Sequence, residues 1–330
     1  MTDLRNSVLA TLAYYDVFDF PLTALEVYRY LINPARIERQ ADGVGEIMVS
    51  DVISTLEELL SQSRIAEKNG YYMLSVERLP VYEKRIAKEK IAALKWKKLL
   101  RIARWFQAVP FLRAVLVSGS MAMNNADEQS DFDVLVIAKS GRMYTCRIFL
   151  SVIASLFRAR RRRYDLVAPG KFCFNHYITD RQLTIRFESL YNAQSYINFR
   201  PVYVQGYILE DLYRENVWLN KYVYNFQPSF LYERRSVKNS RILAMIARMG
   251  ELALAAFLGR VVEKTLRWYQ QKRIRNNAVT YAPGGRTIFD DTQLEFHPHS
   301  AERSILGRYN AMISQLGTFW NYRELDSGLR

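Results

Sequence analysis

The sequence predicts an α+β multidomain protein, and three observations support that prediction. The chain has 330 residues, of which 49% are hydrophobic, and this is enough for more than one packed core. Charged residues make up 24% and aromatic residues 13%, a composition typical of folded chains. Segments with helical spacing of apolar residues occupy both ends of the chain, whereas β-prone runs and helices alternate in its middle.

The chain has two cysteines, Cys146 and Cys173, which do not make a disulfide framework in a chain of this length.

We divide the chain into four parts on the patterns of helices and strands. The four parts are residues 1–80, with helices and a hairpin; residues 81–110, a basic connecting helix; residues 111–190, an α/β unit with a mixed sheet; and residues 191–330, a mainly helical C-terminal domain.

Residues 1–80 carry the signals of helices followed by a hairpin. Helical spacing of apolar residues predicts helices over residues 4–15, 23–32 and 51–63, and Thr23 is the expected N-cap of the second. The Asn69-Gly70 dipeptide between two β-prone runs predicts a hairpin. Three helices followed by a hairpin is the order of a winged helix.

The third of these helices is acidic. It contains Asp51, Glu57 and Glu58, and no basic residue occurs before Arg64. Phosphates would repel such a helix, so we expect it to pack or to contact a protein partner rather than to read DNA.

Residues 81–107 form a long basic helix that ends before Pro110. Nine Lys or Arg side chains lie between Lys84 and Arg104. Two interpretations stay open: a face that binds nucleic acid, and the solvated outer face of an amphipathic connector.

The central part alternates strands and a helix. Residues 112–120 form a buried strand that ends in a Gly/Ser turn, and residues 130–138 form a second strand. A helix is expected over residues 145–163, with further strands over residues 164–168 and 171–179.

The C-terminal part is predicted to be mainly helical. Its longest helix is expected over residues 239–276, and Pro283-Gly284-Gly285 marks a clear break. A strand over residues 287–291 and a final helix over residues 300–317 follow.

Charge and hydropathy limit the partners and the location. Lys and Arg total 47 against 33 Asp and Glu, a formal net charge of +14, and such a field attracts nucleic acid, nucleotides or acidic membrane surfaces. The N-terminus lacks the layout of a secretory signal. The most apolar segment, residues 242–262, is interrupted by Arg248, Glu251 and Arg260, so we expect a buried or amphipathic helix, no membrane span, and a cytoplasmic protein.

Two acids carry the strongest chemical signal. Asp131 and Asp133 lie on a predicted strand, where alternation points both side chains to one face. Two close carboxylates repel each other unless a cation lies between them, and hard oxygen ligands suit Mg²⁺. The preceding turn, Ser118-Gly119-Ser120, offers backbone N–H groups and hydroxyls to a phosphate.

The segment VLVSGSMAMNNADEQSDFDVLV resembles the signature of the DNA polymerase β superfamily of nucleotidyltransferases. That signature is a hydrophobic strand, Gly-Ser, a short helix or loop, and Asp-x-Asp on the next strand. The resemblance is closest to the minimal bacterial nucleotidyltransferases and covers residues 111 to about 170. It implies the nucleotidyltransferase α/β fold for the central part.

The resemblance also implies a third acid on a later strand that reads roughly V-D-L-V. Tyr164-Asp165-Leu166-Val167 occupies that place in this chain, so the resemblance assigns the third carboxylate to Asp165. The alternative third strand covers residues 171–179. In that case Asn175 occupies the position of the acid, and the site is weakened or inactive.

The implied activity is transfer of a nucleoside monophosphate from an NTP, with ATP the expected one, to a hydroxyl of an RNA end or a protein. Asp131, Asp133 and Asp165 would hold Mg²⁺ or Mn²⁺, and in-line attack on the α-phosphate would release pyrophosphate. The rival hypothesis is a non-catalytic regulatory protein that binds nucleic acid or a partner and keeps a degenerate site. The residue in the third position discriminates between the two.

Further basic residues and histidines are candidates for binding roles. Arg147 follows the second strand of the central part and is a candidate phosphate contact, as is the run of Arg158 and residues 160–163, which is expected to end a helix. His297 and His299 form an H-x-H pair without a nearby third ligand in sequence, which is weak evidence for zinc, and His176 is expected to be structural.

Overall fold

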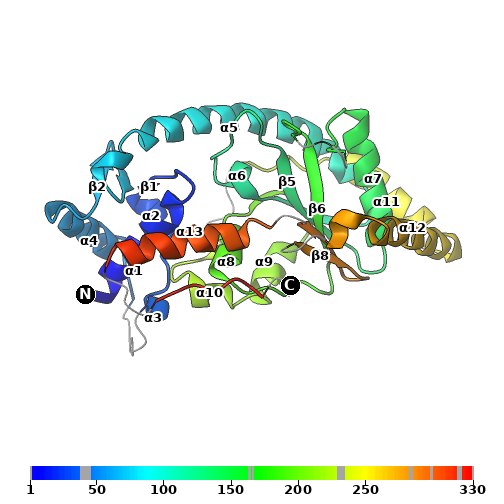
Figure 1. Cartoon of the computed structure of the whole chain (residues 1–330). Helices are drawn as coiled ribbons and strands as arrows, with labels where there is room; N and C mark the ends of the chain where they lie inside the picture. The colour runs from blue at the N-terminus through cyan, green and yellow to red at the C-terminus, as the bar shows by residue number, and fades with distance from the viewer. Residues whose placement is uncertain are drawn as a thin grey trace.

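The computed structural model describes residues 2–37, 46–162, 165, 167–228, 235–281, 285–297, 300–317 and 322–328. In Figure 1 the N-terminal helices lie at one end and the sheet lies toward the other. The long helix α5 (Val81–Ala103) runs along one side of the molecule and links the two regions. The chain is of mixed α and β structure, as the sequence predicts.

The N-terminal region confirms the predicted helices and hairpin. Thr23 Oγ1 accepts a hydrogen bond from Glu26 N at 3.3 Å, and Glu26 Oε2 accepts one from Thr23 N at 2.9 Å, so Thr23 caps its helix as expected. Asn69 and Gly70 have φ values of 52° and 80°, as a two-residue hairpin turn requires. The elements are α1 (Thr2–Asp16), β1 (Leu22–Thr23), α2 (Ala24–Tyr30), α3 (Pro34–Ile37), α4 (Val49–Ser61), β2 (Ala66–Lys68) and β3 (Tyr71–Met73).

The central sheet is mixed, with strand order β7-β4-β5-β6-β9-β8. β5 and β6 are parallel, and the other neighbours are antiparallel. Three of its strands come from residues beyond 190, so the sheet extends across the boundary that the sequence predicts there. The strands are β4 (Leu112–Val117), β5 (Phe132–Ala138), β6 (Phe172–Thr179), β7 (Arg200–Val204), β8 (Arg286–Phe289) and β9 (Gln293–His297).

Because side chains alternate along each central strand, the two faces of the sheet pack into two different hydrophobic cores. Leu116 and Leu135 join a core with the N-terminal helices and with α8 (Leu190–Ile197), α9 (Ile208–Arg214) and α13 (Glu302–Gln315). Val115 and Val134 join a second core with α5 and α7 (Met143–Leu156). The sheet is therefore a middle layer, and burial on both faces explains its nearly continuous apolar strands. The remaining short elements are η1 (Val76–Arg78), η2 (Arg104–Ala108), α6 (Gly119–Ala122), α10 (Leu219–Tyr222) and η4 (Ala278–Tyr281).

The strand expected over residues 164–168 is wrong in its described part. Asp165, Val167 and Ala168 belong to no strand, and Tyr164 and Leu166 lie outside the described residues. The reason is an early end of α7 at Leu156. Arg158 then takes a left-handed φ of 51°, and Arg160 forms a single parallel bridge to Phe172 at the start of β6. The arginine run consequently follows α7 instead of ending it.

The helix expected over residues 239–276 is instead two helices, α11 (Arg241–Ala253) and α12 (Phe257–Arg275), bent by 94°. A Cβ on Gly259 would lie 1.8 Å from the carbonyl oxygen of Leu254, so the bend requires glycine at this position. Among the described residues, no single helix meets the length and hydropathy criteria for crossing a membrane, whereas the bent pair α11 and α12 meets them only when taken together.

The last elements agree with expectation in part. β8 and α13 match the predicted strand and final helix, whereas β9 has no counterpart among the predicted elements. The expected break at Pro283-Gly284 lies outside the described residues.

Candidate functional site

The turn after β4 lies against Asp133 of β5. Ser118 N donates to the carbonyl oxygen of Asp133 at 2.9 Å. Gly119 has a φ of 63°, and a Cβ at this residue would lie 3.3 Å from Asp133 Oδ2. Glycine is therefore favoured here by its left-handed backbone and by the close approach of a carboxylate. Gly119 is exposed, and Ser118 and Ser120 are half-buried, so the turn is open to solvent.

Asp133 lies in β5 and Asp131 directly precedes that strand, and their carboxylates converge on one side, as alternation predicts. A carboxylate oxygen of each and Sγ of Cys173 lie within 4.8 Å of one another. Asp133 pairs with Cys173 in the parallel ladder between β5 and β6. We refer to Asp131, Asp133 and Cys173 as the acidic site.

Each carboxylate of the acidic site has a polar side-chain partner. Arg161 Nη1 lies 2.5 Å from Asp131 Oδ2, and Asn175 Nδ2 donates to Asp133 Oδ1 at 3.1 Å. Burial, followed by the charge of Asp131, raises the pKa of Asp133 to about 6, against the opposing effects of Cys173, Arg161 and Asn175. A cation beside both carboxylates would favour the ionised form of Asp133.

The third position of this site belongs to β6. Cys173 and Asn175 approach the two acids from that strand, and Asp165 does not join the group. The carboxylate of Asp165 instead accepts hydrogen bonds from Lys171 Nζ at 2.9 Å and from Arg162 N at 3.1 Å. Asp165 therefore does not occupy the third position that the sequence assigns to it, because the strand that pairs with β5 is β6 and not residues 164–168. The alternative, with Asn175 at that position, agrees with these contacts.

The donor atoms fit one hard divalent cation. Two carboxylates are what Mg²⁺ or Mn²⁺ takes from a protein when phosphate oxygens and waters complete its coordination. Cys173 is a poor ligand for such an ion, since burial and the charges of Asp133 and Asp131 raise the pKa of its thiol. Within the described residues, no third carboxylate lies in this group to hold a second, acceptor-side ion.

Arg147 lies elsewhere. Its Nη1 donates to Gln270 Oε1 at 2.6 Å, and its guanidinium lies 5.3 Å from the ring centroid of Phe296 and 5.8 Å from that of Tyr177. These partners belong to α12, β9 and β6, and none is in the acidic site. Among the described residues, Arg161 contacts the site, and its place in an arginine run shortly before β6 is the sequence signal that points to it.

The helix α5 borders the same region. Lys95 Nζ donates to the carbonyl oxygens of Ser130 at 2.5 Å and Glu128 at 2.9 Å, just before β5 begins. Trp96 Nε1 donates to the carbonyl oxygen of Met121 at 3.2 Å. The basic helix therefore lies beside the acidic site, where a polyanion held by α5 would be close to the two acids.

A second polar group connects β6 to β9. Ligand-type atoms of His176, Glu295 and His297 lie within 4.8 Å of one another, so β6 supplies the third ligand-type residue that the H-x-H pair lacks in sequence. His299 lies outside the described residues. Arg286 Nε and Gln293 Nε2 donate to the two carboxylate oxygens of Glu295 at 2.6 and 2.8 Å. We describe this group as a buried polar network that fastens the β8–β9 hairpin to the sheet.

Burial is the main cause of the lowered pKa values of the two histidines in this group. It lowers the pKa of His176 to about 3, and the charge of Arg286 acts in the same direction. Burial also lowers the pKa of His297 to about 4, against the opposing charge of Glu295. Both imidazoles are therefore neutral at physiological pH.

Comparison with known proteins gave no match: no family model, curated protein or solved structure is significantly similar to this chain.

Proposed function

We propose that the acidic site binds a nucleoside triphosphate, ATP first, through one Mg²⁺ or Mn²⁺ held by Asp131 and Asp133. The observation that carries the proposal is the close approach of the two carboxylates to each other, with the Asp133 carboxylate beside the open Gly119 turn. When bound, the ion neutralises phosphate charge and orients the triphosphate. The turn of Ser118, Gly119 and Ser120 lies beside the acidic site. Arg161, which is ion-paired with Asp131, is close enough to form an ion pair with a bound phosphate instead.

Two candidate functions both require nucleotide binding: a site that only binds nucleotide, and a site that also transfers it. The residue beside the two acids, at the third active-site position, distinguishes them. Transfer of the nucleotide to a hydroxyl needs a group that takes the proton of the acceptor, a role for which carboxylates are suited. Asn175 cannot accept that proton, and burial and the neighbouring acids keep the Cys173 thiol protonated. We therefore favour a nucleotidyltransferase-type site that binds nucleotide and transfers it poorly or not at all. Nucleotidyl transfer to RNA or protein is the second candidate, supported by the paired acids and the glycine turn.

The partners follow from charge and position. RNA or another polyanion is proposed to bind along the basic helix α5, because Lys95 of that helix lies beside the site. A protein partner is proposed for the N-terminal region, whose α4 carries several acids. We propose action in the cytoplasm, where nucleoside triphosphates are available.

The first test measures nucleotide binding. Equilibrium binding of ATP with and without Mg²⁺ is compared among the wild-type chain, an Asp131→Asn, Asp133→Asn double variant, and an Asp165→Asn control. We expect Mg²⁺-dependent binding in wild type and control, and loss of at least about tenfold in the double variant, the range for lost metal-ligand support. Unchanged affinity in a folded double variant would remove the site assignment.

The second test restores the missing carboxylate. Asn175→Asp places an acid beside Asp133, and Asn175→Ala serves as its control because it removes the amide without adding a base. With α-labelled NTPs and a total RNA and protein extract, we expect weak or no labelling by wild type and a rise of about tenfold or more for Asn175→Asp, within the range for general-base catalysis. Strong wild-type labelling that requires Asp131 and Asp133 would instead establish the transferase.

A further inference from the structure

The helices α11 and α12 turn an apolar surface away from the protein. On α11, Ile242, Met245, Met249 and Leu252 follow helical spacing, and each is more than half exposed. Ile242 is 68% exposed and Leu252 is 67% exposed. An amphipathic helix ordinarily buries this stripe in its own protein.

Polar contacts fix this orientation of α11. Glu251 Oε1 accepts from Phe111 N at 2.8 Å and from Arg113 Nη1 at 2.9 Å. Gly250 lies so close to Pro110 that a Cβ would come within 3.3 Å of its ring. The small and polar side of α11 therefore faces the protein, and its apolar side faces outward.

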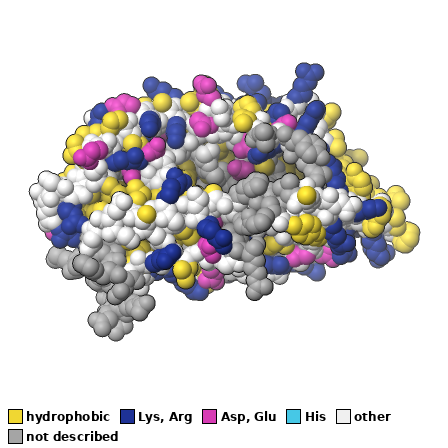
Figure 2. Space-filling model, in the orientation of Figure 1, with side chains coloured by type: hydrophobic (Ala, Val, Ile, Leu, Met, Phe, Trp, Pro, Cys, Tyr) yellow, Lys and Arg dark blue, Asp and Glu magenta, His cyan; other side chains and the backbone are white. Residues whose placement is uncertain are grey.

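The second helix continues the surface. Phe257 and Leu258 at the bend are 72% and 65% exposed, and Trp268 is 63% exposed. Its inward side is again polar, since Glu263 accepts from the backbone nitrogens of Tyr144 at 2.9 Å and Thr145 at 2.8 Å. In Figure 2 hydrophobic side chains gather at the end of the molecule where Figure 1 places α12, with Lys and Arg beside them.

Basic residues outnumber acidic residues around this surface. Both acids within the two helices, Glu251 and Glu263, are turned inward and occupied by the contacts above. Arg267 pairs with Asp291 at 2.7 Å. The exposed basic residues of the two helices are Arg241, Arg248, Arg260, Lys264, Arg267, Lys272, Arg273 and Arg275.

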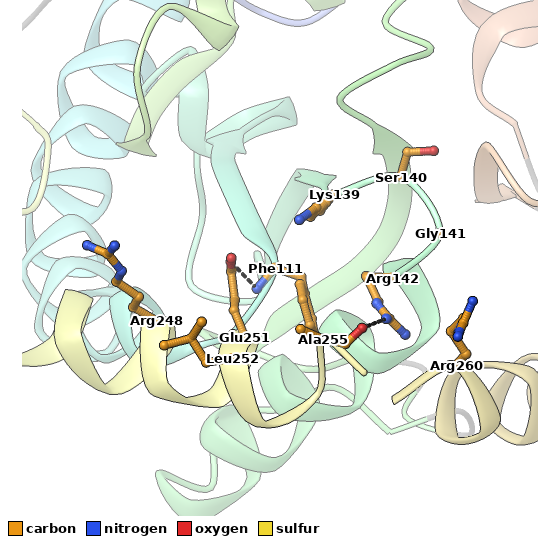
Figure 3. A pocket seen from close by; sticks show the side chains of 10 residues that line it. All are labelled: Phe111, Lys139, Ser140, Gly141, Arg142, Arg248, Glu251, Leu252, Ala255 and Arg260. Carbon is orange, nitrogen blue, oxygen red and sulfur yellow. Dashed lines mark hydrogen bonds between the residues drawn. The ribbon is translucent and has the colours of Figure 1, made fainter. Parts of the chain in front are cut away.

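A basic hollow opens at the bend itself. A cavity of about 520 Å³ lies between the two helices and the turn after β5, and Lys139, Arg142, Arg248 and Arg260 contribute to its lining. Glu251 also lines it, and its carboxylate is already bound by Phe111 N and Arg113 Nη1. Figure 3 shows Lys139 on the sheet side and Leu252 on the helix side of this space. Arg142 Nη1 donates to the carbonyl oxygen of Gly259 at 2.5 Å, which places a guanidinium beside the bend. Cations and apolar side chains therefore meet in one recess.

We propose that α11 and α12 dock this end of the protein onto a membrane that contains anionic lipid. Apolar side chains at the bend enter the boundary of the acyl chains, the surrounding Lys and Arg contact phosphates, and the recess takes a lipid phosphate headgroup. Charged residues recur through α12, so this helix does not cross the membrane, and both helices lie along the membrane surface. A second copy of this chain is a poorer fit, because it would bring the same basic surface and a second charge of +14.

Vesicle sedimentation with the full chain tests the proposal. The probes are phosphatidylcholine vesicles with and without phosphatidylglycerol, at low and high salt. We expect binding only to the anionic vesicles, weakened by salt. Phe257→Ser with Leu258→Ser, and separately Arg248→Gln with Arg260→Gln, should each lower binding by about tenfold or more, because each pair removes apolar burial or headgroup contacts.

The matched control removes exposed apolar side chains elsewhere. Tyr207 and Val217, which flank α9 and belong to neither α11 nor α12, are 79% and 69% exposed, and Tyr207→Ser with Val217→Ser should keep full vesicle binding. A blue shift of tryptophan emission on anionic vesicles, absent in Trp268→Phe, is the second expected signal. Equal binding by all variants, or no binding to anionic vesicles, overturns the proposal. A dimer or a captured protein that depends on Phe257 and Leu258, without vesicle binding, also overturns it.

Discussion

Gly119 couples the backbone of the turn to the chemistry of the acidic site. Its positive φ disfavours most side chains on conformational grounds, and its missing Cβ leaves room for Asp133 Oδ2. A methyl group here would push against the carboxylate that we propose as a metal ligand. The residue therefore affects both stability and binding.

We predict that Gly119→Ala lowers the free energy of unfolding by about 1–2 kcal/mol, the cost of a left-handed alanine. It should also weaken Mg²⁺-dependent ATP binding. Denaturant titration and equilibrium binding check the two effects. Gly206→Ala is the control, because Gly206 has a φ of 59° and a methyl group added there would meet no atom within 4 Å. The control should lose stability and keep ATP affinity; equal losses of affinity in both would contradict the role given to Gly119.

His176 makes stability depend on pH. Its folded-state pKa of about 3 lies below the ordinary value of about 6.5, so the unfolded chain binds a proton that the folded chain does not. Its contribution is fully present above about pH 6.5 and is lost as the pH falls toward 3. His297 acts with the same sign, since its pKa is also lowered.

We predict that the urea midpoint of the wild type falls between pH 7 and pH 4.5, and that His176→Asn reduces this fall. The largest slope from one such group is about 1.4 kcal/mol per pH unit. Urea unfolding of both chains across this range provides the measurement. An identical pH dependence in the two chains would show that His176 is not buried as a neutral imidazole.

At the scale of elements, Arg85 fastens α5 to the N-terminal helices. Its side chain is 4% exposed and pairs with Glu26 at 2.8 Å and Glu89 at 2.6 Å. Its guanidinium also lies 3.5 Å from the ring centroid of Phe20. One residue of the basic helix is thus a structural ion-pair partner rather than part of a nucleic-acid surface.

We predict that Arg85→Met lowers the free energy of unfolding by about 3 kcal/mol, the low end for breaking a buried ion pair, because Glu26 and Glu89 keep some contact with water. Lys90→Met, at an exposed position of the same helix, should change stability by less than about 0.5 kcal/mol. Thermal and denaturant unfolding distinguish the two. Similar small effects would mean that the pair is not needed to join the elements.

Elements with local signals were predictable from the sequence. The Thr23 cap, the Asn69-Gly70 turn and the shared face of Asp131 and Asp133 depend on residues close in the chain, and the structure confirms all three. The pairing partner of β5 depends on long-range packing, so the sequence alone leaves Asp165 and Asn175 as alternatives. The bend before Gly259 also escapes prediction, because continuous helical spacing does not show that a Cβ at that residue would clash with the Leu254 carbonyl.

At the scale of the whole molecule, residues 1–80, the central part and the C-terminal part share one of the two cores. The cluster that contains Val8 and Leu56 continues through Leu116 and Leu135 of the sheet to Ile305 of α13. Buried hydrogen bonds follow the same path. The phenol of Tyr15 donates to Gln194 Oε1 at 2.7 Å, and Gln194 Nε2 donates to the Tyr30 carbonyl at 3.0 Å. The boundaries at residues 80 and 190 therefore do not separate independent cores.

We predict from this shared core that the full chain unfolds in one cooperative transition and that residues 81–330 alone do not fold stably, because removal of residues 1–80 would expose apolar side chains of the sheet and of α8, α9 and α13. Calorimetry of the full chain and circular dichroism of the fragment measure this. Tyr15→Phe, which removes only the hydroxyl that bonds Gln194, should lower the midpoint of the whole transition. Two separate transitions, with only the first shifted by Tyr15→Phe, would instead show that the N-terminal region is an autonomous domain docked on the sheet.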